Sequence, residues 1–201
     1  YTTTRLQCLA DAGGQVVCLR RLLLYPKFLF RLRIRLYIMA DVRIRKRKRL
    51  RNKEVKAISD QLEAELGVPV FSENEPVDRA ESTDFDLLIV GNDILGIVYQ
   101  EKVFLTVRGV IKYKPVKRFV TVDMGAVPFI TNGADCMGPG IVEADESIQE
   151  GDFVWIRDVK NKVPLAVGIS ARSGPELAAK KPGKAIKSLN SVGDKLWKAG
   201  E

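Results

Sequence analysis

The sequence predicts an α+β protein in two successive parts, a small α+β domain at residues 41–115 and a small β-barrel at residues 119–198. Residues 52–66 carry apolar side chains at helical spacing, whereas short β-rich runs fill most of the remainder. Pro115 and the basic stretch after it separate two groups of these runs. We therefore expect one helix packed on an antiparallel sheet in the first part, and a small β-barrel in the second.

The helix of the first part is predicted from apolar residues three or four positions apart, at Val55, Ile58, Leu62 and Leu66. Asn52 is expected to cap its start and Gly67 to end it. Strands are predicted in the runs VPVF, FDLLIV, ILGIVY and VFLTV. The second and third of these runs are expected to form a hairpin around Gly91-Asn92-Asp93.

The second part begins with the strand RFVTVD, after which Asp123 is expected to cap a short helix over Met124–Asn132. Gly133 stands where a left-handed residue ends a helix. The runs GIVEAD, DFVWIRDV and VPLAVGISA are predicted strands, and GPELAAKK one or two helical turns. GKAIKSLN and DKLW are expected to close the barrel, and Trp155 is expected in its core.

The composition excludes several classes of protein. The 201 residues include no histidine, which rules out Ser–His triads, Cys–His dyads and the HExxH zinc motif. Cys8, Cys18 and Cys136 are too few for a disulfide framework or a four-ligand zinc site, so free thiols in a reducing, cytoplasmic compartment are expected. No apolar run approaches the roughly 20 residues of a membrane span. Neither a cofactor nor a metal is predicted.

The net charge of +8 is unevenly distributed. Residues 1–51 carry +12 and residues 52–201 carry −4, although the stretches 102–120 and 171–201 are locally basic. The strongest cluster is RIRKRKRLR at residues 43–51. It is interpreted either as an arm for an anionic partner or as a basic edge strand kept soluble by its charge.

Residues 1–38 are interpreted as a leader or an extension outside the two folded parts. Met39 and the residues after it are typical of a natural protein start. The segment fits a secretory signal poorly, because arginines follow its apolar run and no small-residue cleavage site is present.

The segment richest in glycine and proline, Gly133 to Gly140, contains no evident nucleophile–base pair. Neither phosphate-loop motif fits, because GPGIVE ends in Glu143 and GxxxxGK[ST] is absent. A loop with little side-chain bulk can expose successive amide groups to phosphate or ribose oxygens. A tight connection between a helix and a strand needs the same glycines. Both interpretations are open on the residues alone.

The stretch VDMGAVPFITNGADCMGPGIV resembles the opening of a PUA domain, a module named after pseudouridine synthases and archaeosine transglycosylases. The resemblance continues through EGDFVWIRD, PLAVGIS and GKAIKSLNSVGDKLW. Upstream, RKRLRNKEVKAISDQL and FLTVRGVIKYKP are similar to the pre-PUA domain of the malignant T-cell-amplified sequence protein and its stand-alone archaeal relatives. Together the match covers about residues 41–198.

This resemblance implies a mixed β pseudobarrel that binds structured RNA, often a tRNA acceptor stem and its 3′ CCA end. The first short helix, the glycine loop and the next strand would form the RNA surface. The loop residues that it implies as contacts are Asn132, Gly133, Ala134, Met137, Gly138, Pro139 and Gly140. Basic side chains are expected to contact phosphates beside them, namely Lys117, Arg118, Arg172, Lys184 and Lys187.

The resemblance also implies a non-catalytic role in translation, in which tRNA is placed on or released from the small ribosomal subunit. An initiation-factor-like partner would be supplied by another chain. The alternative is an accessory subunit that delivers RNA to a modifying enzyme. Catalysis by Asp84 with Asp86, or by Asp123 with Asp135, is not expected, because acids in turns usually cap backbone groups or face solvent.

Overall fold

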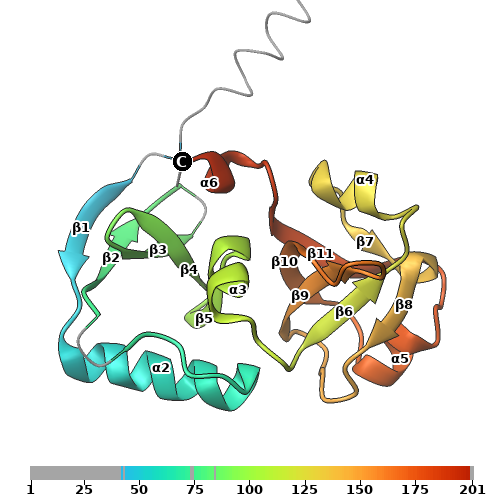
Figure 1. Cartoon of the computed structure of the whole chain (residues 1–201), viewed down its shortest axis with the longest axis horizontal. Coiled ribbons are helices and arrows are strands. Elements are labelled where there is room, and N and C mark those ends of the chain that lie inside the picture. Colours follow the sequence, from blue (N-terminus) through green and yellow to red (C-terminus); the bar gives the residue numbers. More distant parts are fainter. Residues whose placement is uncertain (1–41, 43, 73–74, 84, 200–201) are drawn as a thin grey trace, which may run out of the picture. The chain divides into compact units, whose positions relative to one another are not determined.

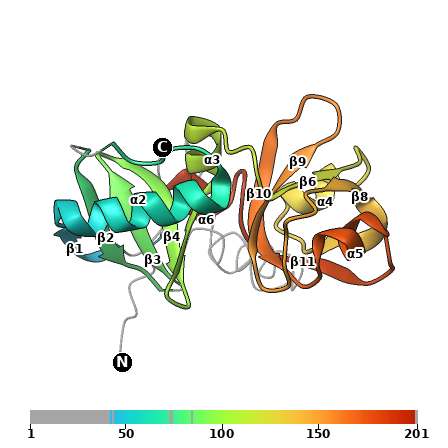
Figure 2. The ribbon, with the colours of Figure 1, turned by 90° about the horizontal axis from the view of Figure 1, so that it is seen from below.

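Two sheets organise the part of the chain that the computed structural model describes, which is residue 42 and residues 44–72, 75–83 and 85–199. An antiparallel sheet has the strand order β1-β2-β3-β4-β5, and a mixed sheet has the order β7-β11-β10-β9-β6-β8 (Figures 1 and 2). This mixture of helices and sheets confirms the predicted α+β class. The prediction for residues 1–38 lies outside the described residues.

The first sheet consists of five strands: β1 (Arg45–Arg49), β2 (Val77–Glu81), β3 (Asp86–Val90), β4 (Asp93–Tyr99) and β5 (Lys102–Leu105). Strands β3 and β4 form the predicted hairpin, in which Val90 pairs with Asp93. Gly91 lies in the turn with φ +63, a left-handed conformation that glycine adopts without steric cost.

Helix α2 (Asn52–Leu66) covers one face of this sheet (Figure 2). Its apolar stripe is buried as predicted, and Gly67 ends it in the left-handed conformation at φ +75. The predicted cap was wrong by one residue. Arg51 is the N-cap, and its backbone N–H donates to the Glu54 carboxylate at 2.8 Å.

A second helix, α3 (Val107–Tyr113), lies where the sequence predicts the end of a strand. Thr106 starts this helix: its hydroxyl accepts the Gly109 N–H at 3.1 Å and donates to the Ile94 carbonyl at 2.7 Å. A Cβ on Gly109 would lie 2.2 Å from the Leu95 carbonyl oxygen. Glycine therefore allows α3 to pack closely against β4.

The second sheet consists of six strands: β6 (Phe119–Val122), β7 (Cys136–Met137), β8 (Ile141–Ala144), β9 (Phe153–Asp158), β10 (Pro164–Ser170) and β11 (Lys184–Ser191). Strand β6 runs parallel to β9 and antiparallel to β8. Short helical segments accompany these strands: α4 (Val127–Thr131), the 3₁₀ turn η2 (Gly138–Gly140), α5 (Gly174–Ala178) and α6 (Lys195–Lys198).

Two predicted strands were wrong. The run VPVF forms no strand, and the sheet instead receives the unpredicted strand β2 a few residues later. The run DKLW forms helix α6, because the Asp194 carboxylate caps it by accepting the Trp197 N–H at 2.8 Å. The barrel therefore ends with β11.

The hydrophobic core continues across the two predicted parts. Phe104 of the first sheet belongs to the same buried cluster as Phe153 and Trp155 of the second. Trp155 is 5% exposed, which confirms its predicted place in the core. Nearby, the buried Asn190 side chain accepts the backbone N–H of Val107 at 2.9 Å. Apolar packing and a buried hydrogen bond thus join the two sheets.

Within the described part of the chain, no helix has the length and apolar character needed to cross a lipid bilayer.

Candidate nucleic-acid interface

The chain after β6 folds into a turn that Asp123 stabilises with both its side chain and its backbone. The Asp123 carboxylate accepts the Ala126 N–H at 2.7 Å, and the Asp123 N–H donates to the Gly140 carbonyl at 2.9 Å. Helix α4 begins only after this turn, rather than at Met124 as predicted. Pro128 in its first turn suits this later start, because the early N–H groups of a helix have no partner within the helix.

Helix α4 turns an apolar residue outwards. Ile130 is 1% exposed and anchors the helix on the barrel core, while its neighbour Phe129 is 67% exposed. Gly133 confirms the predicted left-handed exit, with φ +81. The Ala134 N–H donates to the Phe129 carbonyl at 3.0 Å and fixes the end of the helix.

The glycine loop packs closely against the segment before β11. A Cβ on Gly138 would lie 1.9 Å from the Lys181 carbonyl oxygen, and the Gly138 N–H donates to the Gly183 carbonyl at 3.0 Å. Gly138 is therefore buried and its amide is engaged within the chain. Pro139 and Met137, on either side of it, are exposed.

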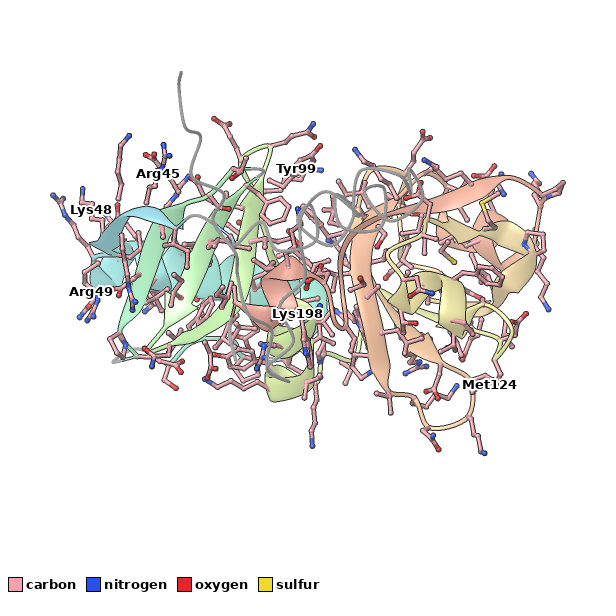
Figure 3. All side chains as sticks on the ribbon, turned by 90° about the horizontal axis from the view of Figure 1, so that it is seen from above. Arg45, Lys48, Arg49, Tyr99, Met124 and Lys198 are labelled. Carbon is pink, nitrogen blue, oxygen red and sulfur yellow. The ribbon has the colours of Figure 1, made fainter. Side chains whose placement is uncertain are left out.

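A cavity of about 460 Å³ lies between α4 and η2. Its lining is mostly apolar and includes two carboxylates, those of Asp123 and Asp135. The lining residues are Asp123, Gly125, Ala126, Phe129, Ile130, Asp135, Cys136, Met137, Pro139 and Gly140. Two of the lining side chains, Phe129 and Met137, are at least half exposed. The nearby Met124, which Figure 3 labels, is also about half exposed. Large exposed apolar side chains around a hollow are typical of a binding site.

The two carboxylates of the cavity differ in their partners. Asp135 binds the Lys184 ammonium at 2.5 Å and accepts the Ser188 N–H at 2.9 Å. The hydrogen bond from Lys184 and, after it, that from Ser188 hold the pKa of Asp135 below its usual value. Asp123 accepts only the Ala126 N–H through Oδ1, and its Oδ2 has no hydrogen-bond partner among the described residues.

Cys136 also lines the cavity, but it is 1% exposed. Burial, and after it the negative charge of Asp123, raises the pKa of this thiol to about 12. The thiol is therefore protonated at neutral pH and behaves as a small apolar group.

The structure brings most of the predicted loop residues to one surface. Exposed residues at α4 and the loop after it are Asn132, Gly133, Ala134, Met137 and Pro139. Gly140 is half-buried, and Gly138 is the buried exception.

The predicted basic residues divide into two groups. Lys117, Lys184 and Lys187 are exposed. The Arg118 guanidinium, by contrast, binds Glu65 at 2.7 Å. The Arg172 guanidinium donates to two backbone carbonyls of the segment 181–182, at 2.7 and 2.8 Å. Lys184 also has a partner within the chain, the Asp135 carboxylate. The role of all five basic side chains as RNA contacts stays a prediction.

Sequence reasoning missed Phe129 and the open oxygen of Asp123. A signal for Phe129 is present in the run VPFIT, where only one of two adjacent large residues of a short helix can face the core. Of the two acid pairs named in the sequence, Asp123 and Asp135 both line the cavity. Asp84 lies outside the described residues, Asp86 binds Arg79 at 2.6 Å, and among the residues that the structure describes no cluster of acids and thiols suits a metal ion.

The chain is similar to known proteins in sequence and in fold. Residues 118–191 match the sequence profile of the PUA domain. An uncharacterized protein of Methanocaldococcus jannaschii is 41% identical over 156 residues, which are 77% of this chain and 96% of that protein. Translation machinery-associated protein 20 of Eremothecium gossypii is 27% identical over 122 residues, which are 58% of this chain and 67% of its own length.

A similar fold is known from a crystal structure of a hypothetical protein of Pyrococcus horikoshii. The two chains superpose with a TM-score of 0.68 at 35% identity, over 78% of this chain and all of that one. The similarity thus extends beyond the second sheet to the first.

Proposed function

This chain belongs to the family of PUA-domain proteins, and we propose that it is a non-catalytic RNA-binding protein of translation that holds the 3′ CCA end of a tRNA beside α4. The observation that carries the proposal is the cavity between α4 and η2, which combines the exposed Phe129 ring with the open carboxylate oxygen of Asp123.

The size and walls of the cavity support a nucleobase as its occupant. Its volume of about 460 Å³ is in the usual range of small-molecule sites, which is about 300–1,000 Å³. Stacking of a base on an aromatic side chain contributes about 1–3 kcal/mol and tolerates any base. Phe129 offers such a ring, and Met137 offers a second apolar contact in the lining of the cavity.

The carboxylates support a preference for bases that carry an exocyclic amino group. Asp123 Oδ2 is a carboxylate oxygen and can accept a hydrogen bond. Cytosine and adenine present an amino group on the edge where uracil presents only an acceptor. All three nucleotides of a CCA end therefore suit this side chain. We propose that Lys184, whose ammonium binds Asp135, contacts a neighbouring phosphate.

Translation is the process that the relatives favour, because one of them is named for its association with the translation machinery. The proposal places this chain in the cytoplasm with tRNA on the small ribosomal subunit, alongside an initiation-factor-like partner from another chain. Sedimentation of the protein with small ribosomal subunits from native extract would support that role. Co-purification with an RNA-modifying enzyme would instead support the delivery of RNA to that enzyme.

The test compares a tRNA that has an intact CCA end with the same tRNA after the end is trimmed. We expect Phe129→Ala to weaken binding of the intact tRNA roughly tenfold or more and to leave the trimmed tRNA unaffected. Asp123→Asn keeps an acceptor for the Ala126 N–H, so the turn should persist while the preference for amino-bearing bases falls. Val163→Ala, at a site 47% exposed on another turn, is the matched control. Equal affinity of the native protein for the two tRNAs would contradict the proposal.

A further inference from the structure

The edge strand β1 carries the densest positive charge of the described chain, and the cavity beside α4 does not use it. All five of its residues, Arg45 to Arg49, are basic and exposed. Strand β1 stands at the end of the strand order and pairs only with β2 among the described residues. The edge-strand interpretation of this cluster is thus confirmed, but it does not account for the amount of charge.

The charge of β1 exceeds that of its carboxylate partners. Asp78, which is 6% exposed, binds both Arg47, at 2.7 Å, and Arg49. Lys46 binds Glu81 at 3.0 Å. Among the described residues, two carboxylates therefore pair with three of the five cations.

Arg45 and Lys48 contribute most directly to this excess, because neither forms an ion pair with a described residue. Lys48 borders a hollow that also contains Glu54 and Glu81, but both acids have other partners. Glu54 accepts the Arg51 N–H, and Glu81 binds Lys46. Figure 3 shows Arg45, Lys48 and Arg49 spreading outwards from β1.

Two arginines of β1, Arg47 and Arg49, are also held in position before any partner binds. The carboxylate of Asp78, which lies opposite Arg49 on β2, accepts hydrogen bonds from both, and Arg47 also donates to the Gly91 carbonyl at 2.7 Å. A single lysine or a bulge is enough to protect a sheet edge from pairing with another chain. A row of oriented guanidinium groups is suited to phosphate oxygens, which they bind in a planar, two-point geometry.

From these observations we infer that β1 is a second RNA-contact surface, which binds the phosphate backbone of an RNA without reading its sequence. An RNA is favoured over a protein because β1 contains no apolar side chain, and the centre of a protein interface is depleted of charge. Figures 1 and 2 show β1 and α4 in opposite halves of the described region. The two surfaces would therefore contact different segments of the bound RNA.

The test removes the two unpaired cations by the double substitution Arg45→Gln and Lys48→Gln. Because neither side chain forms an ion pair with a described residue, the fold should be retained, which circular dichroism and a melting curve will check. The matched control is Lys102→Gln with Lys160→Gln, which removes the same charge from exposed sites outside β1 and the cavity. The probes are the intact tRNA, the trimmed tRNA and a blunt RNA duplex that has no single-stranded end.

We expect the β1 variant to lose affinity for all three probes by a similar factor, on the order of tenfold at 0.1 M salt. Its plot of log affinity against log salt should be shallower by roughly 1 to 2, whereas the control variant should match the native protein. An equal loss in both variants would overturn the inference, since only net charge would then matter. So would unchanged binding of the β1 variant.

The same measurements separate this inference from the proposed function. Phe129→Ala changes the difference between intact and trimmed tRNA, whereas the β1 variant changes both affinities together. If the native protein fails to distinguish the two tRNAs but the β1 variant still loses affinity, the CCA proposal fails and the inference on β1 stands.

Discussion

Phe104 of β5 stacks on Phe153 of β9, with ring centroids 5.2 Å apart and ring planes 10° from parallel. The two residues are 0% and 2% exposed, and each comes from a different sheet. Short linkers usually separate domains that have cores of their own. Here the stacked rings continue the core of the first sheet into the second, so the two sheets are expected to fold as one unit.

Phe153→Ala should therefore destabilise the whole described region and not the barrel alone. Loss of a buried phenylalanine costs about 3–5 kcal/mol, because the cavity left behind is not refilled. Urea unfolding followed by tryptophan fluorescence and by far-ultraviolet circular dichroism should give one coincident transition at a lower midpoint. Two separate transitions in the native protein would show that the sheets unfold independently. Val163→Ala, an exposed truncation, should leave the midpoint unchanged.

The elements that the sequence predicts well are those with local signals. The stripe of α2 buries Leu62 and Leu66, the turn at Gly91 joins two strands, and Gly133 ends the α4 segment in the left-handed conformation. In each case the side-chain spacing or a positive φ decides the structure within a few residues. The family resemblance depends on the same local features.

The elements that the sequence misses depend on distant partners. Strand β2 contains a buried aspartate, Asp78, whose charge is compensated by Arg47 and Arg49, about thirty positions away. Helix α3 follows from the cap at Thr106, although the residues after it favour a strand. In the same way, the sequence shows the positive charge of Arg118 but not Glu65, its partner across 53 positions.

Gly138→Ala should be more destabilising than Gly133→Ala. At Gly138 the added methyl group would collide with the Lys181 carbonyl oxygen at 1.9 Å, a backbone atom that cannot move aside alone. Overpacking of this kind costs about 1–3 kcal/mol or more. At Gly133 the nearest atom is 3.9 Å away, so only the left-handed φ of +81 is strained, at about 1–2 kcal/mol. Melting temperatures of the two variants provide the comparison, and the reverse order would contradict the packing of η2.

The pair of Asp135 and Lys184 should make stability fall at acid pH. The hydrogen bond from Lys184 lowers the pKa of Asp135 from its ordinary 3.8 in the folded state, so the unfolded state takes up the proton first. The stabilisation is complete above about pH 3.8 and is lost as the pH falls through the lower, folded pKa. Asp135→Asn keeps an acceptor for the Ser188 N–H but loses this dependence.

The magnitude of this effect is limited by solvent, because the two side chains are 32% and 53% exposed. At pH 6 the free energy of unfolding of the native protein should exceed that of Asp135→Asn by about 1 kcal/mol. This difference should vanish towards pH 2. Urea titrations of both proteins across this range measure it. A difference that stays constant from pH 6 to pH 2 would mean that the carboxylate does not titrate differently in the two states.

Cys136 should resist alkylation although it lines the cavity. A thiol with a pKa of about 12 is a thiolate roughly a thousand times less often at pH 8 than one at the ordinary 9.0, and only the thiolate reacts. Iodoacetamide treatment followed by peptide mass mapping distinguishes this residue from Cys8 and Cys18. In the native protein the peptide that contains Cys136 should stay unmodified while a small reference thiol is consumed, and in urea it should react fully. Rapid labelling of Cys136 in the native protein would mean that the cavity opens further than the 1% exposure of Cys136 indicates. That result would contradict the apolar wall proposed for base binding.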